Sequence, residues 1–593
     1  MSCRGGPRGW GAAALLLAIA LGGCSGAEKS AVTRIAILPP ENLSGDPSLD
    51  WAGAALAEVL VSDLTGAKNL HAVPVRSRSE VAASGAGQAL YGSYWVSGES
   101  LRIDLSLRDP KREKTAGGFS ASGPKSGGVL RLGNELARKV SSSSRSFGTA
   151  NEEALRAYAD SERSANAGEA VANLEKALAL DPGFGEAWLA IVQHRLALNQ
   201  RDAAVAAIES ARRQGGKIRD IERARLEWIR AELTGDPASG TRALESLTSL
   251  LPGDTDMLVR AARAEYLARH FANAAVWFRK AAELETSNPE LWNQVLYAKV
   301  LAGDERGARG AFERYRKASA ENPNTYDSLG EAMFWFGHFG EAEKGFLEAY
   351  RVDPAFLGGW TMMKAAHARR MNGDRAGAGG LFEKFIEARK QGGDPLLEYY
   401  RARWEYIAGS EKEAEARLES VLRQTKTGEV AVLAGAQLAA WKLAAGDRAT
   451  AGNLAAQALA QPATPAAKLQ AFLCRFAAQP KASPAEWEKR AEREISGAGE
   501  QPVRSVALAY ALLFSGEHAA AAEILKRIYE RSQPTVSGEF SVPLAWSYVE
   551  SGRREEAKAL LQHYAVPSSS AGSVFEFLET RKAPELRRAA GLQ

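Results

Sequence analysis

From about residue 170 onward, apolar residues recur in one pattern roughly every 34 to 37 positions. Each copy has a small residue, a large apolar residue four positions later, and a small or apolar residue three positions after that. These spacings place the three side chains on one helical face, and the small residue lets a second helix approach closely. The copies are Ala170/Leu174/Ala177, Ala204/Ile208/Ala211, Ala274/Phe278/Ala281, Ala308/Phe312/Tyr315, Ala342/Phe346/Ala349, Ala378/Phe382/Phe385, Ala414/Leu418/Val421, Ala521/Leu525/Ile528 and Ala557/Leu561, with weaker ones at Gly240/Leu244/Leu247 and Ala451/Ala455/Ala458.

Each copy is predicted to be one half of a helical hairpin. A large side chain such as Trp188 or Trp292 begins the partner helix about sixteen residues before the small residue. Proline tends to close the unit, because it cannot continue a helix but suits the first turn of the next one. About eleven such hairpins are expected over residues 151–565. A non-repeating helical domain would give no reason for one phase to persist over so many copies.

The copy between Pro323 and Pro354 shows the pattern most clearly. It carries Tyr326, Leu329, Gly330, Met333, Ala342, Phe346, Ala349 and Pro354. At these offsets the series resembles the tetratricopeptide repeat (TPR). The resemblance implies an all-α solenoid with a concave surface for protein or peptide partners.

Residues 33–140 lack the repeat and have short apolar runs instead. The strands predicted from these runs are Arg34–Leu38, His71–Val75, Gln88–Val96, Leu101–Leu107 and Thr115–Ser120. Leu56, Leu60 and Leu64 at intervals of four predict a helix, and Val129–Val140 predicts another. The sequence thus predicts a multidomain protein, in which a small N-terminal α/β (α+β) domain precedes an all-α TPR solenoid.

A motif at the start of this domain carries a second resemblance. The run Ile35-Ala36-Ile37-Leu38-Pro39-Pro40-Glu41-Asn42-Leu43-Ser44-Gly45-Asp46-Pro47, followed by a helix with Leu60 and Asp63, is similar to the TolB amino-terminal-like domain. That family is related in shape to CsgG-type curli-secretion lipoproteins. Pro40 departs from the Phe that is common in the family, and the second predicted helix, Ser79–Ser84, is short.

The loop residues Asn42, Ser44 and Asp46 have two interpretations. They form a recognition loop, or they shape the loop and cap the next helix, since Asn, Ser and Asp side chains hydrogen-bond nearby backbone amides. The second interpretation is the one we favour.

An apolar run near the start of the chain predicts a signal peptide. Arg4 and Arg8 precede the run Trp10–Leu21, which is shorter than the roughly 20 residues that a helix needs to cross a bilayer. The order Leu21-Gly22-Gly23-Cys24 resembles a bacterial lipobox, which implies cleavage before Cys24 and a lipid on its sulfur. Residues 1–23 are then a lipoprotein signal peptide and residues 24–32 a tether. An ordinary secretory signal that contains a cysteine is the alternative.

The lipobox resemblance also implies a location in the cell envelope. Ser25 follows Cys24, where an Asp would imply retention at the inner membrane, so we expect a periplasm-facing protein on the outer membrane. No later run of 18 or more apolar residues exists, so the N-terminal lipid is the only membrane contact that the sequence predicts.

Two further segments interrupt the regular pattern. Residues 141–150 include Ser141–Ser144, carry little apolar surface and are predicted to be a Ser-rich linker that acts as a hinge. Residues 566–593 are predicted to be a C-terminal cap or tail that covers the apolar face of the last hairpin.

Charge and motifs argue against several functions. The formal net charge of +4 falls by two when Arg4 and Arg8 leave with the signal peptide, and its even distribution predicts no nucleic-acid partner. The common metalloprotease, phosphate-loop and Cys-x-x-Cys motifs are absent, and the 7 histidines are scattered. We therefore expect no enzyme activity, no cofactor and no metal site. Cys474 is expected to be a small buried residue.

The concave surface of the solenoid is the predicted partner site. Aromatic and Arg side chains are the usual anchors of protein interfaces. Projecting the repeat onto the first helix of each hairpin places ten residues on or near that surface: Arg263, Tyr266, Asn293, Tyr297, Phe334, Trp335, His367, Arg370, Arg403 and Tyr406. Packing against the next hairpin, or solvation of the arginines, is the competing interpretation for each.

Three hypotheses for the function follow. The first is a lipid-anchored envelope scaffold that binds a protein or peptide in the concave groove. The second is a periplasmic ligand-sensing module. The third is an export component that assembles through the α/β domain, and it leaves self-association of several copies open.

Overall fold

The computed structural model describes residues 33–592, except 66, 68, 69, 111, 113, 287, 496–500, 539 and 568–572. The chain divides into two compact units, Met1–Arg223 and Ala224–Gln593. Unit 1 therefore contains the α/β region together with the first helices of the repeat region. Cys24 and the predicted signal peptide and tether lie outside the described residues.

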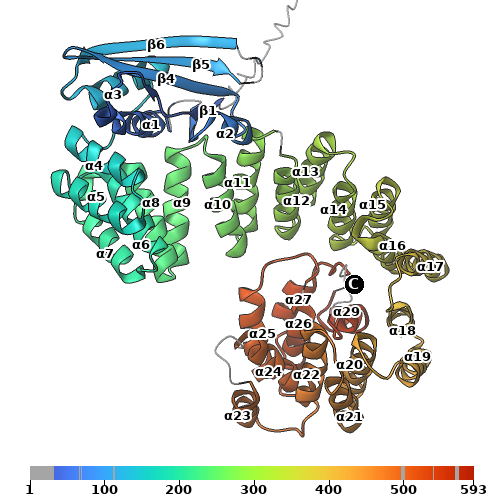
Figure 1. Ribbon diagram of the computed structural model, residues 1–593. Coiled ribbons are helices and arrows are strands. Elements are labelled where there is room, and N and C mark those ends of the chain that lie inside the picture. Colours follow the sequence, from blue (N-terminus) through green and yellow to red (C-terminus); the bar gives the residue numbers. More distant parts are fainter. Residues whose placement is uncertain are drawn as a thin grey trace, which may run out of the picture. The chain divides into compact units, whose positions relative to one another are not determined.

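The α/β region of unit 1 is built on one mixed sheet with the order β3-β1-β4-β5-β6, and β2 pairs beside β4 (Figure 1). The strands are β1 (Thr33–Ile37), β2 (Glu41–Asn42), β3 (Leu70–Pro74), β4 (Gln88–Ser97), β5 (Ser100–Asp109) and β6 (Lys114–Pro124). Strand β1 runs parallel to β3 and β4, while β4, β5 and β6 are antiparallel. In β5 the buried Leu101, Ile103 and Leu105 alternate with polar residues, because successive side chains of a strand face opposite sides.

Helices α1 (Trp51–Leu64) and α3 (Gly128–Val140) pack against each other beside this sheet, and α2 (Arg78–Ala83) is short. The strands and the two longer helices confirm the predicted α/β fold. The two-residue strand β2 was not predicted, because it lies within the polar loop that follows β1.

The rest of unit 1 is helical. Its helices are α4 (Glu152–Glu162), α5 (Ala167–Leu180), α6 (Gly185–Ala197) and α7 (Arg201–Arg212), and α8 (Asp220–Thr234) crosses the boundary to unit 2. Helix α4 packs against α1 of the α/β region. The segment 141–150 differs from the expected hinge. Phe147 is buried against Phe184, and the Arg145 guanidinium donates to the Thr65 carbonyl at 2.6 Å.

Unit 2 consists of helical repeats. Its helices are α9 (Pro237–Leu250), α10 (Thr255–Leu267), α11 (Phe271–Leu284), α12 (Glu290–Leu301), α13 (Glu305–Ala318), α14 (Pro323–Trp335), α15 (Phe339–Val352), α16 (Trp360–Met371), α17 (Arg375–Gln391), α18 (Leu397–Ala408), α19 (Glu411–Gln424), α20 (Glu429–Ala444), α21 (Arg448–Leu459), α22 (Pro465–Ala477), α23 (Pro484–Glu494), α24 (Gln501–Ser515), α25 (His518–Arg531), α26 (Ser541–Glu550), α27 (Arg554–Leu561), α28 (Phe577–Arg581) and α29 (Ala583–Ala589).

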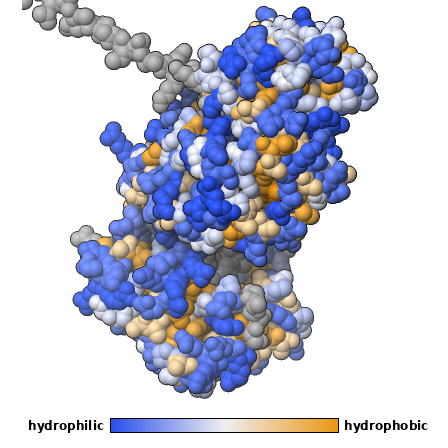
Figure 2. All heavy atoms as spheres, turned by 90° about the vertical axis from the view of Figure 1, so that its left-hand side faces the viewer, coloured by the Kyte–Doolittle hydropathy of each residue, from blue (hydrophilic) through white to orange (hydrophobic). Residues whose placement is uncertain are grey.

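The hairpin α14–α15 shows why the repeat needs its small residues. Ala342, Phe346 and Ala349 are fully buried between the two helices. A Cβ on Gly330 would lie 2.5 Å from the Phe346 ring, so only glycine permits this close crossing. The predicted all-α solenoid of the TPR type is confirmed. The face shown in Figure 2 is mostly hydrophilic, with apolar residues exposed between the polar ones.

A buried ionic cluster joins the α/β region to the first helices of unit 1. Arg219 donates to Glu186 and, at 2.7 Å, to Ser62 on α1. Asp63, the next residue of α1, is completely buried, and neither of its carboxylate oxygens accepts a hydrogen bond from a described residue. Burial, opposed by the Arg219 charge and reinforced by Glu186, raises the pKa of Asp63 to about 8. Asp63 is therefore mostly protonated at neutral pH.

Asp63 should make unit 1 less stable as the pH rises. The unfolded chain releases this proton near pH 4, whereas the folded chain keeps it to about pH 8, so stability falls across that range. We expect Asp63→Asn, which cannot ionise, to weaken the pH dependence and to raise the free energy of unfolding by about 1–3 kcal/mol at pH 9. Urea unfolding from pH 5 to pH 9, with exposed Asp202→Asn as the control, measures this. Coincident pH profiles of Asp63→Asn and the unchanged protein would contradict it.

Candidate functional site

The ten residues predicted to line the concave surface all belong to unit 2. They lie on or at the ends of α10, α12, α14, α16 and α18, the first helices of successive hairpins. Arg263 is exposed to solvent, whereas the other nine are buried or half-buried against other parts of the chain. The contacts of each residue show what covers it.

Two of the ten residues lie on α12, and both form polar contacts inside the unit. Asn293 is buried, and its amide donates to Glu290 at 3.1 Å. The Tyr297 hydroxyl donates to the Glu331 carboxylate of α14 at 2.6 Å. Burial is the main reason that the pKa of Tyr297 lies well above its usual value. The Asn293 bond stays within α12, whereas Tyr297 joins α12 to α14 of the next hairpin.

A buried lysine continues this polar row from α14 to α16. Lys364 is 1% exposed, and its ammonium donates to Asp327 at 2.8 Å and to Glu331 at 2.5 Å. Burial, opposed by the Lys364 charge, raises the pKa of Asp327 to about 6. Asp327, Glu331 and Lys364 were missed by the sequence analysis. The signal was present, because Glu331 stands 34 residues after Tyr297 and so has the same repeat offset.

The residues at the end of α14 contact the chain that follows α27. Phe334 is buried beside Phe339, with ring centroids 5.2 Å apart. Trp335 stacks on His563 at 5.1 Å, and its carbonyl accepts from the Tyr564 amide at 3.0 Å. At the end of α10, the Tyr266 hydroxyl donates to the Pro534 carbonyl at 3.2 Å. The concave ends of α10 and α14 are thus covered by later parts of the same unit.

Residues 573–578, which we call the inner segment, lie against the concave surface at α18, α20 and α22. Arg403 forms an ion pair with Glu576, and Tyr406 packs edge-on against Phe577 at 5.4 Å. The Gln437 amide donates to the Val574 carbonyl at 2.7 Å, and the Val574 amide donates to Gln470 at 3.2 Å. Both backbone groups of Val574 are therefore satisfied by side chains of the solenoid.

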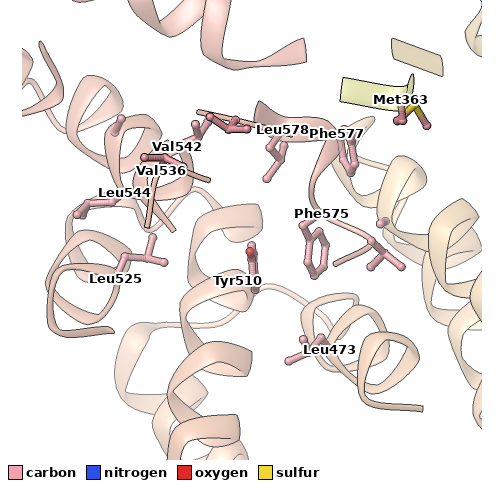
Figure 3. Close-up of a cluster of buried hydrophobic side chains, with 14 of the residues drawn as sticks. Met363, Leu473, Tyr510, Leu525, Val536, Val542, Leu544, Phe575, Phe577 and Leu578 are labelled. Carbon is pink, nitrogen blue, oxygen red and sulfur yellow. The ribbon is translucent and has the colours of Figure 1, made fainter. Parts of the chain in front are cut away.

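An aromatic side chain anchors the inner segment. Phe575 stacks on Tyr510 with centroids 4.1 Å apart and also contacts Phe514. Figure 3 shows Phe575 beside Tyr510 and near Leu473, while Phe577 points towards Met363. Within the region predicted to be a C-terminal cap or tail, α29 packs on α26 and α27 of the last hairpin. The inner segment and α28 instead reach the middle of the repeat series.

The predicted loop of the α/β region satisfies its own polar groups. The Asn42 carbonyl oxygen accepts from the Ser44 amide at 3.0 Å and from the Ser44 hydroxyl at 2.5 Å. Asp46 accepts from the Ser48 amide at 2.9 Å, and the hydrogen bonds to Ser48 lower the pKa of Asp46. Each of these three side chains makes bonds that shape the loop.

Three further features of the described residues concern metal binding, membrane spans and the cysteine. No group of three or more His, Cys, Asp or Glu side chains is placed to hold a metal ion in the described ranges. No described helix has both the length and the apolarity to cross a membrane. Cys474 is buried, its thiol lies 3.4 Å from the Ala436 carbonyl, and burial raises its pKa.

Comparison with known proteins finds the same class of repeat. The tetratricopeptide repeat family matches residues 163–226. A curated relative, the general transcriptional corepressor trfA of Dictyostelium discoideum, is 23% identical over 147 residues, which are 24% of this chain and 10% of that protein. The chain thus matches about a tenth of the length of that relative.

Two solved structures align over most of their own length but over less than half of this chain. MamA from Desulfovibrio magneticus RS-1 is 16% identical, with 29% of this chain and 96% of that chain covered and a TM-score of 0.25. The C-terminal part of a TPR repeat-containing protein from Cytophaga hutchinsonii is 14% identical, with 46% and 95% covered and a TM-score of 0.29. Each match covers less than half of the present chain.

The inner segment should contribute strongly to the stability of unit 2. Phe575 is 2% exposed, so Phe575→Ala leaves a cavity and should lower the free energy of unfolding by about 3–5 kcal/mol. Urea unfolding monitored by tryptophan fluorescence measures the change. Val276→Ala, at an exposed position of α11, is the control and should stay within about 0.5 kcal/mol. If Phe575→Ala lowered the free energy of unfolding as little as the control does, the inner segment would not be anchored by Phe575.

Proposed function

We propose that this chain is a protein-binding scaffold of the bacterial cell envelope, tethered by a lipid on Cys24. Tetratricopeptide repeats suggest a scaffold for protein–protein interaction, and the repeat fold and the family match support this role. The envelope location, the lipid and the periplasm-facing orientation rest on the lipobox resemblance at Leu21–Cys24. The scaffold catalyses no reaction and holds no cofactor.

One observation carries the binding role. The concave surface of unit 2 already holds a peptide of its own, the inner segment, through contacts of the kind that bind foreign peptides. Gln437 and Gln470 hydrogen-bond the main chain of Val574, while Arg403 pairs with the acidic Glu576. Hydrogen bonds to the main chain give affinity for any peptide segment, and pockets for side chains give selectivity. The contacts to the inner segment therefore support the proposal that this surface is suited to binding peptides.

The exposed face of α10 is where a partner binds. Arg263 is exposed, and Leu267, four residues later on the same helical face, is 58% exposed. An exposed leucine next to an arginine combines apolar contact with selectivity for acidic groups. The partner is therefore a protein with an apolar and acidic segment.

The α/β region has a separate role in this proposal. Its resemblance to the TolB amino-terminal-like domain, carried by Ile35–Pro47, supports docking or assembly at the membrane. Helix α4 packs on α1, so the region and the first repeats act together. An export component built from several copies remains the alternative, and the mass of the detergent-solubilised protein distinguishes the two.

Photo-crosslinking in the native host tests the partner site. We expect p-benzoylphenylalanine at position 267 to yield a defined protein adduct, because Leu267 is 58% exposed on α10. The same residue at position 276 is the matched control, since Val276 is 39% exposed on α11, the second helix of that hairpin. Arg263→Glu should reduce the adduct at position 267 several-fold. An identical set of adducts at both positions, or none at position 267, would refute the proposed site.

The lipid anchor is tested by membrane extraction. The protein should carry metabolically incorporated palmitate and enter the detergent phase, because acyl chains on Cys24 add roughly 0.8 kcal/mol per buried methylene group. Cys24→Ala should abolish both properties, whereas Cys3→Ala, in the predicted signal peptide, should keep both. A Cys24→Ala protein that still enters the detergent phase would overturn the anchor.

A further inference from the structure

A cavity of about 510 Å³ lies inside unit 2. One wall is formed by the ends of α12, α14 and α16 and by the start of α11, through Leu301, Trp335, Arg370 and Phe271. The opposite wall comes from the chain after α25 and from α27, α28 and α29. Cavities of this size hold small organic ligands.

The charges around the cavity are unbalanced. Four arginines line it, namely Arg269, Arg370, Arg587 and Arg588. Glu576 is the one carboxylate among the described lining residues, and it is paired with Arg403. The cavity is therefore electropositive, which favours a negatively charged ligand.

Arg370 lacks a counter-charge. No carboxylate among the described residues forms an ion pair with it, and its guanidinium makes two long contacts, 3.5 Å to the Ile407 carbonyl and 4.0 Å to the Met371 sulfur. Its Nε–H is buried without an acceptor. Burial first, and then the positive charges of Arg375 and Arg581, lower the pKa of Arg370. A buried, unpaired charge destabilises a protein unless something compensates it.

Two more polar groups in this wall lack partners. His367, one helical turn before Arg370, is 6% exposed, and no described residue hydrogen-bonds its ring. Burial and the charges of Arg370 and Arg403 lower its pKa to about 3, so the ring is neutral and has a nitrogen free to donate or accept. The indole Nε1–H of Trp335 is also buried without an acceptor in the described chain. Buried polar groups normally have hydrogen-bond partners, so these unpaired groups indicate that a ligand supplies the partner.

The rest of the same wall is apolar. Four apolar side chains at the ends of α12, α14 and α16 and at the start of α11 line the cavity: Phe271, Leu301, Phe334 and Met371. An apolar lining with a few convergent polar groups is typical of a site that binds an amphipathic small molecule and fixes its polar end.

We propose that this cavity binds a small carboxylate with an apolar body, whose carboxylate faces Arg370, His367 and Trp335. Arg370 supplies the charge, and the indole and imidazole nitrogens supply further hydrogen bonds. The apolar body lies against Phe271, Leu301, Phe334 and Met371. Since the walls include α28 and α29, the ligand also fixes the C-terminal helices against α14 and α16. This site differs from the partner surface on α10 and stands independently of it.

Calorimetry with two carboxylates and their alcohols tests the site on the mature, full-length protein. We expect octanoate and indole-3-acetate to bind, and octanol and indole-3-ethanol to bind roughly 10- to 100-fold more weakly, because a charge-assisted hydrogen bond is lost. Arg370→Met should remove this preference, and Arg370→Lys should restore part of it. Arg423→Met, at an exposed arginine of α19, should bind like the unchanged protein.

Two further measurements separate lost binding from lost folding. Arg370→Met removes a buried unpaired charge, so its thermal midpoint without ligand should be unchanged or higher. Ala559→Trp, which fills the cavity from the exposed side of α27, should abolish binding of both carboxylates. The proposal is overturned if neither carboxylate binds at millimolar concentration, if alcohols and carboxylates bind equally, or if folded Arg370→Met keeps the preference.

Discussion

The packing of the inner segment on the concave surface is the constraint on which the rest of unit 2 depends. In an open solenoid each repeat contacts only its neighbours, so stability is a sum of local terms. Here Arg403 contacts Glu576 and Tyr266 contacts Pro534, pairs that are 173 and 268 residues apart in the sequence. These contacts join the early hairpins to the last ones, so we infer that unit 2 unfolds as one cooperative body.

This closure limits where a partner can bind. Most of the predicted concave residues are already engaged: Tyr297 with Glu331, Trp335 with His563, and Tyr406 with Trp441 and Phe577. A partner that used this whole surface would have to displace the inner segment and lose the burial of Phe575. A partner on α10 would not need to displace the inner segment. A small ligand in the proposed cavity site and a protein on the exposed helix would therefore be compatible in one unit.

The repeat pattern predicted the helices and the faces that pack between them, because a period near 34 residues reports which face of each helix packs inward. It did not predict what covers that face. The run Val574–Leu578 is short, lies outside the repeat, and gave no sign of docking on α18 and α20. The order of strands in the α/β region was also beyond the sequence, since alternation predicts strands but not their neighbours. Arg403 was predicted to contact a partner, and in the structure it forms an ion pair with Glu576 of this chain.

The polar row Tyr297–Glu331–Lys364–Asp327 shows why the inner face is not simply apolar. Lys364 is almost completely buried, and its two carboxylates lie on α14, so a shift of α16 by one turn would separate them. Apolar side chains in these positions would stabilise the unit at least as much, because burying an ion pair stabilises little compared with burying hydrocarbon. They would also tolerate such a shift, since apolar contacts are not directional. The row therefore fixes the register between consecutive hairpins more than it adds stability. That register positions His367 and Arg370, on the same helix as Lys364, at the wall of the cavity.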